Sequence, residues 1–198
     1  KDRRIGERKT TITRVSNNDA KGFLDKHHIQ GYSKGCVNKG LCDDKHDIVA
    51  VMSLRRTREH GEDALLINRY ATSINVQGGV TKLLSHAIMQ SPDIRYVVSF
   101  SDNCVSDGGL YASNGFHMDK MIPPDYMYMV NGRRIHKFNY RRRRFLNDPL
   151  LHYEDGLTER QLADINGLNR IWDAGKMKWV MRVNDHKKSA IHGRDVVS

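Results

Sequence analysis

The feature of this sequence that most constrains its fold is an apolar helix predicted between two strand-like runs. Gly78 and Gly79 open the helix, and Pro92 stops it. Apolar side chains recur on one face of this segment, at Val80, Leu83, Leu84, Ala87 and Ile88. Residues 63–71 before it and 96–100 after it have the apolar, β-branched composition of strands. This order of elements predicts a mixed α/β domain.

Other local signals extend the pattern on both sides of this unit. Ser16, followed three residues later by Asp19, marks the start of a helix that ends near residue 28. Asn131-Gly132 is a strong two-residue turn signal and predicts a hairpin. Further elements are expected as strands at 9–15, 33–42, 46–55, 169–174 and 176–183, a strand beginning at Phe116, a short helix at 108–114, the hairpin strands within 126–138, and a capping box at Thr158 and Gln161.

With 198 residues, the chain is long enough for one sizeable domain with small appendages. We expect a basic N-terminal arm over residues 1–8, a main domain over residues 9–139 and a mobile tail over residues 184–198. Residues 140–183 are expected to form a basic helix and a small C-terminal α+β extension. Trp172 and Trp179 would close the core of this extension.

The overall composition excludes several classes of protein. Hydrophobic residues make up 38% of the chain and charged residues 28%, a balance typical of globular rather than disordered proteins. No apolar run approaches the roughly 20 residues of a membrane-spanning helix, and no hydrophobic stretch follows the basic N-terminus. We therefore expect a soluble, cytoplasmic protein that makes no contact with a membrane.

The cysteine content gives no sign of a disulfide framework. Cys36, Cys42 and Cys104 are an odd number and too few for one, which fits a reducing compartment. Cys36, Cys42 and His46 lie close enough in sequence to suggest zinc, but the spacing is not a usual zinc pattern and a fourth ligand is not evident. Small strand residues beside an exposed turn explain them more simply, so we expect no metal.

The net charge of +10 is concentrated in two short segments. Residues 1–15 carry a net charge of +4, and residues 133–144 carry +7 with no acidic residue. A solvated helix face normally interleaves both signs, so the second segment is unusual. Arginine dominates it, and the planar guanidinium suits bidentate contacts to phosphate and guanine. Nucleic acid is the favoured partner, and an anionic membrane, an acidic protein or an ordinary basic face are the alternatives.

These charges predict a surface for double-stranded DNA. His136, Phe138 and Tyr140 are interleaved with the basic residues and would either stack on the ligand or anchor the segment to the core. His27 falls on the apolar face of its helix, whereas His28 follows the helix and could reach a ligand. The residues predicted to bind DNA are Arg133, Arg134, Lys137, Arg141, Arg142, Arg143, Arg144, Arg55, Arg56, Arg58, Arg3, Arg4 and His28.

Two segments carry a resemblance to a known family: Val76-Gln77-Gly78-Gly79-Val80 before the predicted helix, and Tyr111-Ala112-Ser113-Asn114-Gly115-Phe116 before a strand. With the order of elements, they resemble the Gcn5-related N-acetyltransferases (GNAT). The resemblance implies a central mixed sheet flanked by helices. It also implies that acetyl-CoA or another acyl-CoA binds at Gly78, Gly79 and Lys82, with its phosphates at the helix N-terminus, and that Tyr111 protonates the departing thiolate. Alternatively, the glycine pair only permits tight packing, and Tyr111 packs beneath the sheet.

A second resemblance extends from about Thr11 to Val180. The matching residues are Phe23-Leu24 through His28 and Gly31, Val76 to Leu83, a Ser-x-x-Asp loop before Gly-x-x-Tyr-x-x-x-Gly-Phe, and Ile171, Asp173 and Gly175. They resemble a module of Hef-like phage homing endonucleases and, more distantly, the phage Mom-type DNA-modifying transferases. This resemblance implies a DNA-addressing module of a phage or mobile element, in a bacterial host cell, with the nuclease in a separate domain tethered upstream.

The leading interpretation is therefore a DNA-binding module on a GNAT-like fold, with no cofactor, that targets an endonuclease or represses transcription. Asp102 and Asp107 crowd a loop at the end of a strand, where catalytic groups often lie, but Asp107 as a helix N-cap is the simpler account. The alternative is an acyl-CoA-dependent GNAT transferase that modifies a DNA base or a protein amine. A third hypothesis is a basic module that binds an acidic protein. The sequence does not define the oligomeric state.

Overall fold

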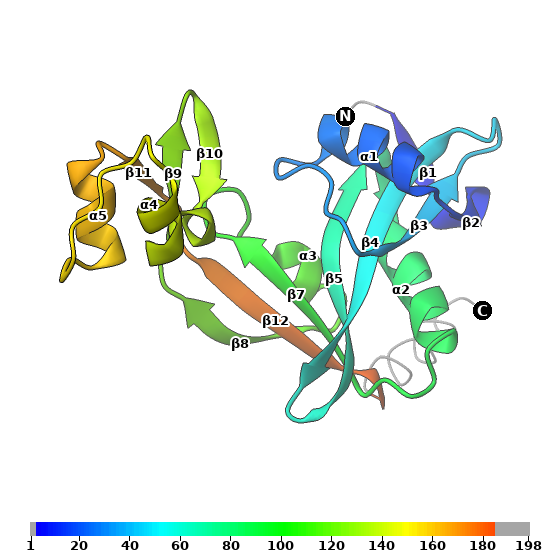
Figure 1. The fold of residues 1–198 in the computed structure, drawn as a ribbon. Helices are drawn as coiled ribbons and strands as arrows, with labels where there is room; N and C mark the ends of the chain where they lie inside the picture. The colour runs from blue at the N-terminus through cyan, green and yellow to red at the C-terminus, as the bar shows by residue number, and fades with distance from the viewer. Residues whose placement is uncertain (1–2, 185–198) are drawn as a thin grey trace. The chain divides into compact units, whose positions relative to one another are not determined.

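The computed structural model describes residues 3–184, and these divide into two compact units (Figure 1). The first unit contains residues 3–101, 108–120 and 177–184. The second unit contains residues 102–107 and 121–176, so it is an insertion into the first. The boundary expected at residue 139 falls inside this insertion. The mobile tail expected at 184–198 lies outside the described residues, apart from residue 184.

A seven-stranded sheet forms the centre of the first unit. Its strands lie in the order β2 (Thr11–Arg14), β3 (Val37–Cys42), β4 (Ile48–Glu59), β5 (Glu62–Thr72), β7 (Tyr96–Asp102), β12 (Lys176–Arg182) and β8 (His117–Ile122). Neighbours from β2 to β5 run antiparallel, whereas β5 and β7 run parallel. A separate two-stranded ladder joins β1 (Arg4–Gly6) in parallel to β6 (Asn75–Gln77), and the 3-10 helix η1 (Glu7–Lys9) follows β1.

Helices cover both faces of this sheet. They are α1 (Asn17–His27), α2 (Gly79–Met89) and the short α3 (Gly109–Ala112). Along β4, Val51 packs with α1, whereas Ala50 and Met52 pack with α2, and successive strand residues point to opposite faces. The mixed α/β fold predicted from the sequence, with a central sheet flanked by helices, is therefore confirmed.

Local sequence signals explain where the helices begin. The backbone N–H of Asp19 donates to Ser16 Oγ at 3.1 Å, which confirms the predicted start of α1. Gly78 occupies the N-cap position of α2 with a φ of +73°, a conformation that favours glycine. At α3 the N-cap position is taken by Gly108 rather than by Asp107.

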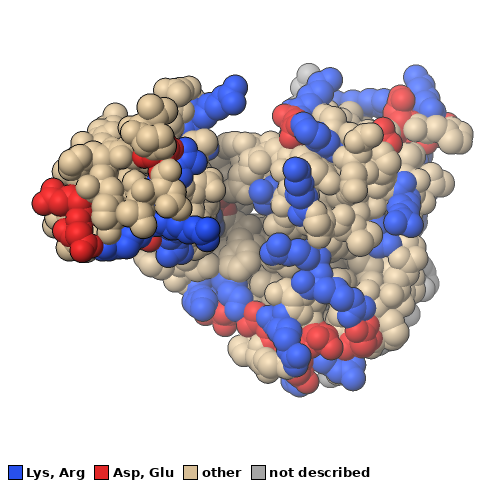
Figure 2. All heavy atoms as spheres, viewed as in Figure 1, with Lys and Arg blue, Asp and Glu red and all other residues tan. Residues whose placement is uncertain are grey.

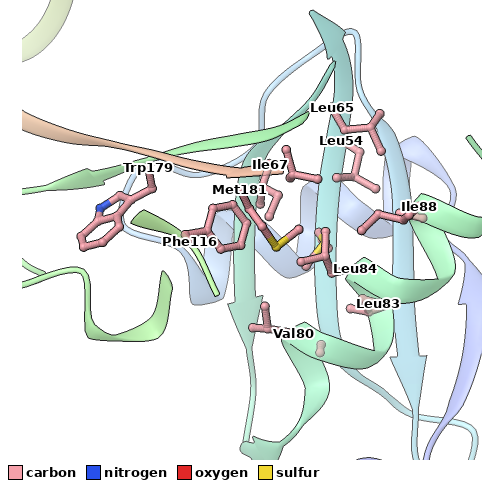
Figure 3. Packing of buried hydrophobic residues seen from close by; sticks show 14 of the residues in the cluster. Leu54, Leu65, Ile67, Val80, Leu83, Leu84, Ile88, Phe116, Trp179 and Met181 are labelled. Carbon is pink, nitrogen blue, oxygen red and sulfur yellow. The ribbon is translucent and has the colours of Figure 1, made fainter. Parts of the chain in front are cut away.

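The main core lies between α2 and the sheet (Figure 3). The apolar face predicted for α2 points at the strands, and the side chains in contact include Val80, Leu83, Leu84, Ile88, Leu54, Leu65, Ile67, Phe116 and Met181. Trp179 belongs to this core and is 7% exposed, whereas Trp172 in the insertion is 53% exposed. The prediction that these two tryptophans close one C-terminal core is therefore wrong.

The insertion has its own three-stranded antiparallel sheet and a small aromatic core. Its strands are β9 (Tyr126–Val130), β10 (Arg133–His136) and β11 (Asn169–Trp172), in the order β10-β9-β11, and its helices are η2 (Lys137–Tyr140), α4 (Arg142–Asn147) and α5 (Glu159–Ile165). The hairpin around Asn131-Gly132 and the capping box at Thr158 are confirmed. The predicted pair of strands about Gly175 is wrong, because β11 pairs with β9 while β12 lies in the large sheet.

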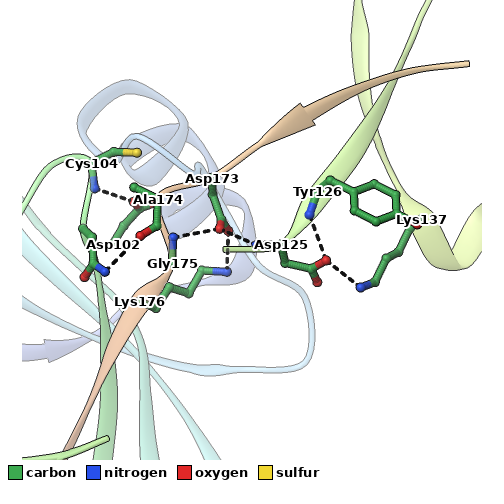
Figure 4. A network of polar contacts seen from close by, with 10 residues as sticks. Asp102, Cys104, Asp125, Tyr126, Lys137, Asp173, Ala174, Gly175 and Lys176 are labelled. Carbon is green, nitrogen blue, oxygen red and sulfur yellow. Dashed lines mark hydrogen bonds and ion pairs between the residues drawn. The ribbon is translucent and has the colours of Figure 1, made fainter. Parts of the chain in front are cut away.

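The two connections to the insertion are tied to each other (Figure 4). The carboxylate of Asp173 accepts backbone N–H bonds from Asp125 at 2.8 Å and from Gly175 at 3.0 Å. The carboxylate of Asp125 in turn accepts from Lys137 Nζ at 2.5 Å. Gly175 has a φ of +79°, and a Cβ there would lie 2.4 Å from the carbonyl oxygen of Ile122. These contacts hold both crossing segments together where the chain leaves and re-enters the first unit.

Candidate active site

The parallel strands β5 and β7 separate partway along their length. Their register ends where Ile67 lies opposite Ser99, although β5 continues to Thr72. On its other side β5 contains a bulge, since the register with β4 passes from Ile67 directly to Arg69 and leaves Asn68 as an extra residue. Ligands often bind at the carboxyl ends of parallel strands where neighbouring strands diverge. This opening is the candidate active site.

A short chain of hydroxyl groups borders the opening. Ser99 Oγ lies 3.1 Å from the carbonyl oxygen of Ile67 and 2.9 Å from the hydroxyl oxygen of Tyr111. A carbonyl can only accept, and a serine hydroxyl has a single proton to donate. All three groups are satisfied when Tyr111 donates to Ser99 and Ser99 donates to Ile67. The phenolic proton of Tyr111 is thereby held at the end of the β5–β7 ladder.

The ring of Tyr111 is part of the core while its hydroxyl group is part of this chain. The ring stacks on Trp179 with 5.9 Å between centroids and contacts Phe116 edge-on at 5.6 Å. Burial raises the pKa of the Tyr111 hydroxyl, and a hydrogen bond that Ser99 can donate to the ionised oxygen opposes this effect. Tyr111 therefore keeps its proton at neutral pH. The packing role and the chemical role considered for this residue are compatible.

The N-terminus of α2 opens into a hollow of about 340 Å³. Gly78 makes no side-chain capping bond, and the first helical hydrogen bond runs from the Lys82 N–H to the Gly78 carbonyl at 3.0 Å. The preceding N–H groups of the first turn therefore have no acceptor within the helix. Thr81 and Asn114 are among the polar residues that line the hollow. Such a helix end favours an anion, because its N–H groups and dipole both present positive charge.

The two glycines at this helix end have different reasons to be glycine. A Cβ at Gly79 would lie 2.9 Å from Val76 Cγ1 and 3.1 Å from the Tyr70 hydroxyl, so Gly79 permits close packing. A Cβ at Gly78 would lie 2.8 Å from the carboxyl carbon of Glu7, and its φ is positive as well. The tight-packing account fits Gly79, whereas Gly78 forms the uncapped end of the helix.

The N-terminal arm lies against this same end of α2. The carboxyl group of Glu7 packs beside Gly78, and Lys82 Nζ donates to the carbonyl oxygens of Glu7 at 2.8 Å and Thr10 at 2.5 Å. Lys82, expected to bind a cofactor, therefore fastens η1 to the helix. The sequence pattern does not single out Glu7. The strand β1, which precedes Glu7, has only three residues and is too short to show the periodicity of a strand.

These residues fit the anionic, amide-bearing chain of an acyl-CoA. The uncapped first turn of α2 offers N–H donors to phosphate, and backbone of β5 beyond Ile67 is not paired with β7. The Glu7 side chain lies beside the helix end and is only partly buried. Gly78, Gly79 and the following turn are the groups that would meet the phosphates of such a ligand.

His28 lies on the other side of β5, beside Arg69. Its Nδ1 accepts the backbone N–H of Gln30 at 3.1 Å, so in the neutral ring the proton is on Nε2. Burial, with a smaller contribution from the charge of Arg69, lowers the pKa of His28 to about 4. His28 is therefore uncharged at neutral pH.

Most of the basic residues predicted in the insertion are engaged with acids of the insertion itself. The ion pairs join Lys137 to Asp125, Arg141 to Glu159, Arg142 to Asp155 and Arg144 to Asp148. Arg133, Arg134 and Arg143 form no ion pair with any residue between 3 and 184. Four of the seven basic residues between positions 133 and 144 therefore form ion pairs within the insertion itself.

The other predicted basic residues belong to the first unit. Arg55, Arg56 and Arg58 lie at the end of β4, and Arg4 begins β1. Arg3 forms an ion pair with Asp43 at 3.0 Å, and Arg56 forms one with Asp93. Figure 2 shows Lys and Arg side chains spread over both units, with acidic side chains among them. The predicted DNA-binding residues are thus divided between the two units.

The cysteines and acidic loop residues form no metal site in the part of the chain that the structure describes. Cys36 and Cys42 are free thiols, and the Asn68 amide nitrogen lies 3.4 Å from Cys36 Sγ. The carboxylate of Asp102 accepts the Cys104 N–H at 2.9 Å and so shapes its own loop. No helix within residues 3–184 is long and apolar enough to cross a membrane.

No protein-family model matches this chain, and no curated protein matches its sequence. Solved structures do match its fold. A mutant form of the spermidine N-acetyltransferase SpeG from Vibrio cholerae has a TM-score of 0.53 at 9% identity, covering 90% of this chain and 96% of that chain. Another structure of SpeG from Vibrio cholerae, with manganese ions, has a TM-score of 0.50 at 8% identity, covering 94% and 98%.

These findings overturn the leading interpretation of the sequence. A non-catalytic module that binds double-stranded DNA is wrong, because the structural neighbours are N-acetyltransferases. Of the thirteen residues behind that prediction, six form ion pairs with acidic residues of the chain. The comparisons give no support to a likeness with phage homing endonucleases or Mom-type transferases. The chain has the fold of the GNAT N-acetyltransferases.

Proposed function

We propose that this chain is an acyl-CoA-dependent N-acyltransferase. The observation that carries the proposal is the opening between β5 and β7. The hydroxyl pair of Ser99 and Tyr111 lies at the last pairing of the two strands, and Tyr70 and Thr72 of β5 beyond it line the hollow at the uncapped N-terminus of α2. An anion-binding helix end and a proton donor at diverging strand ends are the two parts that acyl transfer from a thioester requires.

An acyl-CoA, when bound, supplies a thioester with an electrophilic acyl carbon. Transfer of that acyl group to an amine would release a thiol, with a proton needed at the sulfur and the proton of the amine passing to solvent. Tyr111 would supply the proton at the sulfur and regain one from solvent, since burial keeps its hydroxyl protonated. Ser99 then turns its own proton toward the Tyr111 oxygen and stabilises the phenolate.

Calorimetry with acetyl-CoA and the Tyr111→Phe variant together test this proposal. The parent should bind acetyl-CoA with a dissociation constant on the order of micromolar, and the variant should bind equally, because its ring still packs on Trp179. Acetyl transfer from radiolabelled acetyl-CoA to a library of lysine-containing peptides should fall about 100-fold in the variant.

Tyr96→Phe is the matched control, because it removes a phenolic hydroxyl from β7 outside the opening. It should leave both binding and transfer unchanged. No heat of binding at about 1 mM acetyl-CoA would refute the proposed function. Equal transfer by Tyr111→Phe and the parent would instead remove Tyr111 from the mechanism.

A further inference from the structure

The insertion contains two adjoining hollows, of about 580 and 490 Å³, that share Asn139 and Arg144. Phe138, Arg141 and Arg143 also line the first, and Arg133 and Ile135 also line the second. We call these seven residues the insertion groove. The proposed acyl-transfer chemistry uses none of them.

Positive charge in the insertion groove exceeds the negative charge available to it. Arg133 and Arg143 have no carboxylate partner among residues 3–184. Arg144 pairs with Asp148 at 3.0 Å, which shows that a carboxylate fits a guanidinium at this place. Arg141 stacks on the Phe138 ring at 4.3 Å, and its nearest carboxylate oxygen is 3.9 Å away. The groove therefore favours a ligand that brings carboxylates.

The strand β10 adds a row of backbone groups beside these charges. It is an edge strand, since within the described chain its sheet has the order β10-β9-β11. Val130 and Arg133 flank the two-residue turn and pair with each other, so the N–H and C=O of Arg134 and His136 point away from β9. An extended polypeptide can add to such an edge through main-chain hydrogen bonds.

The neighbouring side chains select which polypeptide can pair there. A second copy of β10 would bring two more arginines onto this four-residue edge, beside Arg133 and Arg134, and like charges repel. Phe138 is 59% exposed and offers an apolar contact next to the charges. The edge therefore suits a strand that alternates acidic with apolar residues.

We propose that the insertion groove binds an extended acidic polypeptide segment, whose backbone pairs with β10 and whose carboxylates contact Arg133 and Arg143. The backbone pairing favours a polypeptide over a nucleic acid, which has no amide groups to continue a sheet. The binding is independent of acyl transfer. The role of the groove in recruiting the acceptor protein rests on the proposed function.

Fluorescence polarisation of the full chain with a short labelled peptide of alternating glutamate and valine tests this inference. The double variant Arg133→Gln/Arg143→Gln should bind this peptide about tenfold more weakly, because two partly exposed ion pairs are lost. The control Arg14→Gln/Arg160→Gln removes the same charge from two exposed positions outside the groove and should change affinity less than twofold. Methylating alternate backbone nitrogens of the peptide should also weaken binding, because it removes the donors that pair with β10.

Three outcomes would overturn the inference. The first is that a peptide with glutamine in place of each glutamate binds as tightly as the acidic peptide. The second is that both double variants lose the same affinity for the acidic peptide. The third is that a random duplex DNA binds more tightly than the peptide and depends on Arg133 and Arg143. Circular dichroism melts must show that both double variants remain folded. Acetyl-CoA calorimetry on the same samples separates the two proposals: peptide binding without acetyl-CoA binding refutes the proposed function and leaves the groove standing.

Discussion

The contact between Glu7 and Gly78 predicts opposite effects of one substitution on stability and on cofactor affinity. The carboxyl group of Glu7 lies against the cap residue of α2, where a negative charge is stabilised by the helix dipole. Glu7→Gln keeps the size of the side chain and removes the charge. We expect the variant to lose about 0.3–1 kcal/mol of stability, or roughly 1–3 °C in melting temperature.

Acetyl-CoA affinity should move in the other direction. The Glu7 carboxyl lies beside the helix end that would hold a phosphate. Two unit charges about 5 Å apart repel by about 1 kcal/mol in water and about 3 kcal/mol at the effective dielectric of a protein surface. Glu7 is partly exposed, so we expect a value near the lower end. This corresponds to roughly fivefold to tenfold tighter binding in Glu7→Gln, measured by calorimetry at low salt.

The matched control is Glu62→Gln, which removes an exposed carboxylate at the start of β5, away from α2. It should change neither the affinity nor the melting temperature by a comparable amount. Unchanged or weaker acetyl-CoA binding by Glu7→Gln, in a protein that remains folded, would refute the placement of the cofactor phosphates at the N-terminus of α2.

Two further predictions concern the fold around the site. Gly108→Ala should destabilise the protein by about 3 kcal/mol or more, since the new Cβ would lie 1.9 Å from the Trp179 side chain and the φ of this residue is +81°. The control Gly115→Ala has a similar φ of +82° but open space around the new Cβ, so it should cost only about 1 kcal/mol. Equal losses of stability in urea unfolding would contradict the clash with Trp179. The pKa of His28 is about 4 in the folded chain against 6.5 when exposed, so the unfolded chain binds the extra proton and stability should fall as the pH drops from about 6.5 to about 4. His28→Gln should reduce that loss by about 1 kcal/mol in urea titrations at pH 7 and pH 5, and an identical pH dependence in parent and variant would show that His28 is not buried as described.

Local signals in the sequence were sufficient for the elements whose ends are set by neighbouring residues. Ser16 caps α1, the glycine pair opens α2, and Asn131-Gly132 forms the hairpin turn as predicted. The pairing of β11 and β12 was not predictable in the same way. Both segments look like strands, but their partners lie far away in the chain, in β9 for β11 and in the large sheet for β12.

The candidate site was predictable only in part, for a similar reason. The sequence pattern singles out Gly78, Gly79 and Tyr111, because backbone geometry and ring chemistry depend on residue type. It does not reveal that Glu7 meets Gly78, since that contact depends on the pairing of β1 with β6. Charge counting also misled, because it cannot show which arginines are paired with nearby acids, as Arg142 is with Asp155.

Hydrogen–deuterium exchange of the full chain with and without saturating acetyl-CoA tests the central claim most directly. The account predicts protection in the first turn of α2, at residues 79–82, and in β5 beyond its last pairing with β7, at residues 68–71. The insertion should show no change. Acetyl-CoA binding that leaves these two segments unprotected, or that protects the insertion instead, would contradict the assignment of the cofactor to this opening.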